Sequence, residues 1–278
     1  MRWLLAFASC LVGCYSPQPH AGSPCPDGVC PDGLVCSPAT VTCERTAIDA
    51  GPHDGPPRDV ALDVPLDAVT VIDAPPAISP QLVQQKGRER TASASLDVTL
   101  DAAPTTGNLL VVIGGAVSGQ LDAVSGGGVA SWTRAAFSPI SANCEIWFGA
   151  TNGSSSTVTI SLPSSTSSMT MLVTEWSHVA AMLDGATVNA IAGSPASAGS
   201  ITTTNAHDLL LFAIANFTPN TNGSLAGYTP LTTLPGTQTG VQQAAWYREV
   251  TTTGTYAPSI TITNNEWDAC LVALKVAP

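Results

Sequence analysis

The chain has 278 residues, of which only 10% are charged, and its formal net charge at pH 7 is −11. A nucleic-acid-binding protein presents a basic stripe, but this sequence has nine Lys and Arg residues in all, so we exclude nucleic acid as a partner. Low charge with abundant Ser, Thr, Gly and Val is typical of an exported all-β protein.

The N-terminus has the features of an export signal. One basic residue, Arg2, precedes a short apolar run over 3–12, which is shorter than the roughly 20 residues of a membrane span but suits a secretory signal. The run ends in Leu-Val-Gly before Cys14, which resembles the lipobox of bacterial lipoproteins. The resemblance implies a signal peptide over 1–13, lipidation of Cys14 and anchoring through that lipid at the outer membrane or cell surface. An ordinary signal peptide that contains a cysteine is the alternative.

Residues 14–45 form a cysteine-rich segment. After Cys14 it contains four cysteines with two Pro-Asp-Gly turn signals among them, and they are Cys25, Cys30, Cys36 and Cys43. In an oxidising compartment this pattern predicts a disulfide-held stalk too small for a core of its own, with three pairings open. Zinc is disfavoured, because the spacings are not Cys-x-x-Cys pairs and no His interleaves. A block of this kind behind a lipobox resembles the stalks of surface lipoproteins in myxobacteria.

Residues 46–91 are predicted to be a disordered linker. Six aspartates recur among Pro, Gly, Ala and Val between Asp49 and Asp73, and repelling charge with frequent proline keeps such a segment extended. Calcium binding by this series is the alternative, but the Gly hinge and spaced oxygens of a calcium loop are missing.

Residues 92–278 are predicted to form an antiparallel β-sandwich. The continuous apolar runs 108–117 and 208–217 indicate central strands buried on both sides or at a sheet interface. Segments of the first half return about 100 residues later, for example 107–111 at 207–211, so we expect two sequence-similar halves that interleave in a jelly-roll-like sandwich. Two small sandwiches are the alternative. One domain is preferred because Cys144 and Cys270, which we expect to form a disulfide, lie in different halves.

Glycines and aromatic residues carry a second resemblance. The segment 124–133 contains Gly126, Gly127 and Gly128 followed by Trp132. Together with Thr-Glu-Trp-Ser at 174–177 and Leu-Asp-Gly at 183–185, it resembles an uncharacterised family of bacterial extracellular β-sandwiches. Proteins of that family often carry carbohydrate-binding or adhesion modules. The likeness implies a fold and leaves the function open.

The sequence shows no recognisable catalytic constellation. No Gly-x-Ser-x-Gly elbow occurs, so we predict a protein that is not an enzyme and needs no cofactor. Glu175 is expected to face inward, where a carboxylate must be hydrogen-bonded, paired or metal-bound. A bond to nearby backbone or to a Trp N–H is the main interpretation. A structural Ca²⁺ held by Glu175 or by Asp184 is the alternative.

Aromatic residues on strands are the candidates for stacking on a ligand, since exposed rings pack against the apolar faces of sugars. Burial in the core is the competing interpretation for each of them. The candidates are Trp132, Trp147, Trp176, Trp246, Tyr247 and Trp267.

The sequence thus predicts a cell-surface lipoprotein that displays a β-sandwich binding or adhesion module for a polysaccharide or a surface protein. A structural envelope lipoprotein without small-ligand binding is the first alternative, and a glycan-active hydrolase is the second.

Overall fold

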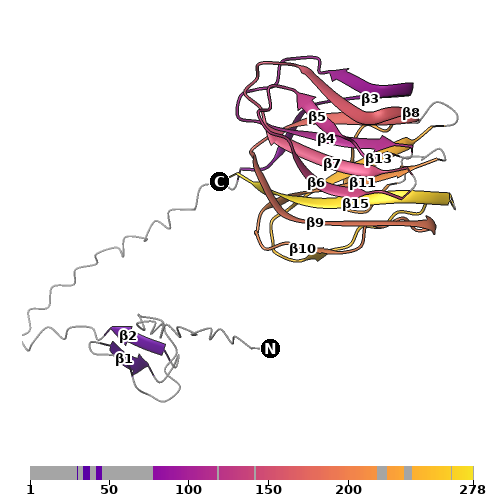
Figure 1. The fold of residues 1–278 in the computed structure, drawn as a ribbon. Coiled ribbons are helices and arrows are strands. Elements are labelled where there is room, and N and C mark those ends of the chain that lie inside the picture. The colour runs from indigo at the N-terminus through magenta and orange to yellow at the C-terminus, as the bar shows by residue number, and fades with distance from the viewer. Residues whose placement is uncertain are drawn as a thin grey trace, which may run out of the picture. The chain divides into compact units, whose positions relative to one another are not determined.

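The computed structural model describes residues 30, 34–37, 42–45, 78–117, 119–140, 142–217, 224–234, 240–263 and 265–277. The chain divides into two compact units, Met1–Thr70 and Val71–Pro278. Every regular element in these ranges is a strand, and the sheets are antiparallel, so the all-β prediction is confirmed (Figure 1). Over the same ranges there is no helix of the length and apolarity that a membrane crossing requires. Cys14 lies outside the described residues.

The first unit contains a small hairpin of β1 (Leu34–Ser37) and β2 (Thr42–Arg45), which pair antiparallel. A disulfide joins Cys30 to Cys43, and Cys36 is also disulfide-bonded. Of the three pairings that the sequence left open, the structure therefore has one with the Cys30–Cys43 bridge. Cys25 lies outside the described residues.

The second unit begins with a six-stranded sheet in the order β3-β8-β4-β7-β6, in which β5 also pairs with β8. Its strands are β3 (Gln81–Thr99), β4 (Leu109–Ala116), β5 (Ala123–Gly126), β6 (Thr133–Ser138), β7 (Cys144–Ala150) and β8 (Thr157–Ser177).

A five-stranded sheet in the order β12-β13-β11-β15-β9 follows, and β10 pairs with β14 in a separate ladder. These strands are β9 (Val179–Gly193), β10 (Ile201–Thr202), β11 (Asp208–Asn216), β12 (Thr229–Pro230), β13 (Gln242–Val250), β14 (Thr255–Tyr256) and β15 (Asn265–Val276).

Each sheet is built from one contiguous half of the chain. The interleaved jelly roll is therefore wrong, because its strands would alternate between the halves within a sheet. If β5, β10 and β14 are left aside, each half contributes five strands to its sheet. Numbered 1 to 5 along the chain, these strands lie side by side in the order 1-5-2-4-3 in both sheets. A duplicated half would produce this order, and the similarity of the two sequences stays a prediction.

Both sheets are covered on both faces. Their inner faces share one core, which contains Leu109 and Val111 of β4 and Leu209 and Leu211 of β11. The alternate residues of the same strands enter two outer cores, one over each sheet. All residues of β4 and β11 are consequently buried, which confirms that the two continuous apolar runs are central strands.

The long β3–β8 strand pair covers the outer face of the six-stranded sheet. Its register shifts between Ser93 and Ser95, next to Ala92, whose φ is +50°. Leu96 and Val98 then pack with Val158 and the outer face of β4. The first half of β3 is a strand within the predicted linker 46–91, so that boundary is wrong. This part of β3 lies at the edge of the sheet, and its side chains are mostly polar. Backbone pairing with β8 therefore stabilises it, where other strands rely on a buried apolar face.

Candidate functional site

A hollow of about 690 Å³ lies beside the outer face of the five-stranded sheet. We call it the Arg248 pocket. Arg248 lies two residues after Trp246 on β13, so both side chains are on the outer face of the sheet. Trp246 packs in the outer core there. The other walls come from the turn before β12 and from the chain over 255–261. The polar residues of the lining are Ser224, Tyr228, Arg248, Thr255, Tyr256, Ser259 and Thr261.

Two tyrosine rings flank the guanidinium of Arg248. Its Cζ atom is 5.8 Å from the ring centroid of Tyr228 and 5.5 Å from that of Tyr256. Both distances are within the range of cation–π attraction. The rings therefore hold the arginine head in place at the wall of the pocket.

The hydroxyl groups of the two tyrosines are directed differently. Tyr256 donates to the Thr252 carbonyl at 2.8 Å. The Tyr228 hydroxyl is buried without a hydrogen-bond partner among the described residues. Burial raises the pKa of Tyr228 to about 12, although the charge of Arg248 acts in the opposite direction. The Tyr228 phenol therefore stays neutral at physiological pH, and Arg248 is the one acidic or basic side chain among the lining residues.

Glu175 fastens a loop to the six-stranded sheet. It is fully buried, and its Oε1 accepts hydrogen bonds from Thr105 N at 2.8 Å and Asn108 Nδ2 at 2.6 Å. Its Oε2 accepts from Gln84 Nε2 at 2.6 Å. Protein donors thus satisfy both oxygens, as a structural role requires. In the described part of the chain, no cluster of three or more His, Cys, Asp or Glu is placed to hold a metal ion.

Glu145, on β7, has a similar environment. It accepts from Leu121 N at 2.6 Å and from Trp147 Nε1 at 2.9 Å, and Arg134 Nη1 is 3.8 Å from its Oε2. Burial raises the pKa of Glu145, and these three neighbours oppose that rise. This carboxylate therefore fastens the chain that precedes β5 to β7.

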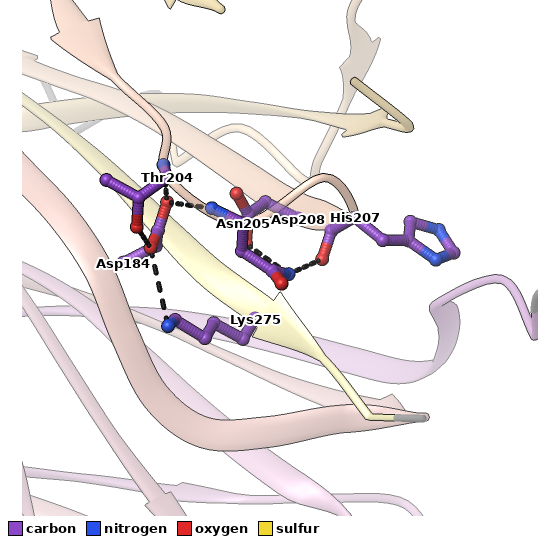
Figure 2. Close-up of polar contacts among 6 residues, drawn as sticks. All are labelled: Asp184, Thr204, Asn205, His207, Asp208 and Lys275. Carbon is purple, nitrogen blue, oxygen red and sulfur yellow. Dashed lines mark hydrogen bonds and ion pairs between the residues drawn. The ribbon is translucent and has the colours of Figure 1, made fainter. Parts of the chain in front are cut away.

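Asp184 fastens the turn before β11, as Figure 2 shows. Its carboxylate accepts from Thr204 N at 2.6 Å, Thr204 Oγ1 at 2.5 Å and Asn205 N at 3.1 Å. Lys275 Nζ lies 3.5 Å from its Oδ1. Burial disfavours ionisation, but the hydrogen bonds and the charge of Lys275 outweigh it and lower the pKa of Asp184 to about 2. Asp184 itself lies within β9, so a strand residue and not a turn residue supplies this carboxylate, and it holds the turn through Thr204 and Asn205.

Asp208 lies next to this turn. It is fully buried, and its Oδ1 accepts from Asn205 Nδ2 at 3.2 Å, while its Oδ2 has no partner among the described residues. Burial and the charge of Asp184 raise the pKa of Asp208 to about 6, against the influence of Asn205 and Lys275. Only 1% of the Asp184 side chain is exposed, so the two carboxyl groups are closed to solvent and cannot receive a substrate as acid and base.

The predicted stacking residues are distributed unevenly between core and surface. Trp176, Trp246 and Trp267 are buried, so these three cannot stack on a ligand. They face cores because each sheet is covered on both sides. The ring of Tyr247 meets Trp176 edge-on at 4.9 Å, at the margin of the shared core.

Trp132 and Trp147 are half-buried. Trp132 packs against the outer core of the six-stranded sheet and donates to the Gly126 carbonyl at 3.4 Å. Trp147 contacts the same core, and the Cζ of Arg134 lies 5.5 Å from its ring centroid. The structure does not bring these residues together with the Arg248 pocket.

Cys144 and Cys270 meet in the core between the sheets, as expected from their positions on β7 and β15. Both are free thiols, so the disulfide predicted between them is absent from this structure. The Cys270 thiol donates to the Cys144 carbonyl at 2.9 Å, and the Cys144 thiol lies 3.7 Å from the Ala213 carbonyl. Each sulfur thus has a backbone acceptor, and burial raises the pKa of Cys270 well above its usual value.

Sequence reasoning missed Arg248, Tyr228 and Tyr256. One signal for Arg248 was present, because the predicted repeat aligns 146–151 with 245–251 and so puts a long cation at the position of Gly149. The tyrosines lie in irregular segments whose approach to β13 the local sequence does not predict.

No protein-family model, curated protein or solved structure matches this chain. The resemblances drawn from its sequence motifs therefore stay predictions.

Proposed function

We propose that this protein is a lipid-anchored surface protein whose β-sandwich binds a glycan in the Arg248 pocket. The observation that carries the proposal is the pocket itself, a hollow of about 690 Å³ whose wall holds an arginine between two tyrosines. Binding sites are concave and combine apolar surface with a few placed polar groups.

The lining of the pocket favours a sugar as the ligand. Ser224, Thr255, Ser259 and Thr261 supply hydroxyl groups, which can exchange hydrogen bonds with the hydroxyls of a saccharide. The half-buried ring of Tyr256 can pack against the apolar face of a pyranose. This mixture of hydroxyls and aromatic surface fits a saccharide better than an apolar side chain.

The two alternative functions have less support. A structural envelope protein without small-ligand binding leaves the pocket unexplained. A hydrolase needs two carboxylates that face a substrate across a cleft, whereas Asp184 and Asp208 are buried and occupied with a turn. We therefore favour binding over both.

The anchoring part of the proposal rests on the sequence. Cys14 follows a short apolar run with a lipobox-like end, and an acidic, proline-broken segment separates it from the sandwich. A tether of this composition extends by about 3 Å per residue, which suits display of a binding domain away from the membrane. Replacing Cys14 with Ser should release the protein from membranes, and continued partitioning of C14S into the membrane fraction would contradict the anchor.

Retention on immobilised polysaccharides tests the binding part. We expect the full-length protein to bind at least one polysaccharide, with and without calcium, and Tyr256→Ala to reduce retention at least tenfold. Trp132→Ala is the matched control, since it removes a half-buried aromatic residue that does not line the pocket, and should retain binding. Absence of retention on every polymer, or equal losses in the two variants, would refute the site.

A further inference from the structure

Arg248 is a cation without an acidic partner. Three of the other five basic residues over 78–277 have a carboxylate partner, namely Lys86 with Asp101, Arg134 with Glu145 and Lys275 with Asp184. The fourth, Arg88, donates to the Asp97 carbonyl. The fifth, Arg90, donates to the Ser95 carbonyl. No hydrogen bond or ion pair joins the Arg248 guanidinium to a residue that the structure describes, and its contacts are the two tyrosine rings.

The pocket adds no negative charge of its own. Its lining contains neither Asp nor Glu, although the whole chain carries a formal charge of −11. An unpaired cation in a partly enclosed site retains its attraction for an anion, because less water is present to screen it. The charge of this pocket is therefore opposite to that of the protein as a whole.

We infer that the glycan bound in the Arg248 pocket is acidic and that Arg248 binds a carboxylate on one of its sugar rings. The guanidinium presents its N–H donors in a planar fork that matches the two oxygens of a carboxylate. Tyr228 and Tyr256 fix the head of the side chain, so little ordering remains when the ligand binds. Hydroxyl groups around it suit the rest of the sugar, and the ligand class is thus a uronic-acid saccharide.

This inference rests on the proposed glycan-binding function. A comparison of two ligands tests the carboxylate contact separately from glycan binding. An oligogalacturonate and its methyl ester have the same sugar backbone and differ only in the charge of the carboxyl groups. By titration calorimetry, we expect the full-length protein to bind the acid form at least tenfold more tightly than the ester. The affinity for the acid form should fall as the salt concentration rises.

Variants of Arg248 test the residue itself. Arg248→Gln should lower the affinity for the acid form at least tenfold and leave the affinity for the ester nearly unchanged. Arg248→Lys, which keeps the charge and loses the fork, should have an intermediate affinity. Arg88→Gln, at an exposed arginine on β3, is the control and should bind both ligands as the wild type does. Melting temperatures near that of the wild type would show that the variants are folded.

The outcomes that contradict the inference differ from those that contradict the glycan proposal. Equal binding of acid and ester, or equal losses for both in R248Q, would overturn the carboxylate contact and leave glycan binding standing. Tighter binding of dextran sulfate than of the oligogalacturonate would also overturn it. No binding of either ligand or of any neutral glycan would overturn both. Binding only of peptides with a free C-terminal carboxylate would overturn both in favour of a protein ligand.

Discussion

Glu175 is expected to be one of the strongest single contributors to the stability of the sandwich. Replacing it with Gln keeps the shape and removes the charge. If the amide oxygen takes the place of Oε1, the bonds from Thr105 and Asn108 persist with a neutral acceptor, which is roughly half as strong. The new NH₂ group then faces the Nε2 donor of Gln84. Gln84 cannot simply turn over, because its amide also exchanges two hydrogen bonds with the backbone of Ala102 at 3.1 and 3.2 Å.

The expected loss follows from these contacts. One charge-assisted hydrogen bond contributes about 1.5–3 kcal/mol, and weakening two more costs about 1 kcal/mol each. The lower cost of burying a neutral amide offsets part of this sum. The net change is therefore about 2–4 kcal/mol, which corresponds to a fall of roughly 5–15 °C in Tm for a domain of this size.

Urea unfolding followed by tryptophan fluorescence measures this change, since Trp176 lies next to Glu175 and is buried. Glu266→Gln is the matched control, because Glu266 is exposed on β15 and should change stability by less than about 0.5 kcal/mol. An E175Q protein within that margin of the wild type would refute the structural role of the carboxylate.

Three further predictions concern other parts of the sandwich. Asp208 has a raised pKa, so its ionised form destabilises the fold. The wild type should therefore lose stability relative to Asp208→Asn as the pH rises from about 4 through 6. A difference in Tm between the two proteins that does not vary with pH would contradict this. Cys144 and Cys270 should be unreactive to a thiol reagent in the folded protein, and the thiol count should rise by two on unfolding; no rise would indicate a disulfide. Gly126→Ala should cost more than about 2 kcal/mol, because φ is +81° and a Cβ would lie 2.2 Å from the Thr157 carbonyl oxygen. Gly107→Ala is the control, because Gly107 has φ +89° but open space around a Cβ, so this variant should lose only the backbone cost of about 1 kcal/mol. Equal losses of stability in the two glycine variants, measured by urea unfolding, would show that the clash with Thr157 is unimportant.

Much of the fold could be predicted from local patterns. The continuous apolar runs at 108–117 and 208–217 identified the central strands, because only a strand covered on both faces buries every residue. The cysteine block predicted disulfides, and the Cys30–Cys43 bridge is present. Period-two alternation cannot identify a strand such as 81–91, since its side chains are mostly polar and its stability comes from pairing with β8.

The sequence by itself thus determined the class of the fold, the central strands and a disulfide-bonded N-terminal segment, because these depend on residues close together in the chain. Tertiary structure alone decided which aromatic residues are exposed. Trp176 and Trp246 look alike on their strands, but Trp176 packs in the core between the sheets and Trp246 in the outer core of the five-stranded sheet. The tertiary structure alone also brought Tyr228, Arg248 and Tyr256 together around one pocket. Their proximity depends on how loops cross a folded sheet, and no local pattern encodes that approach.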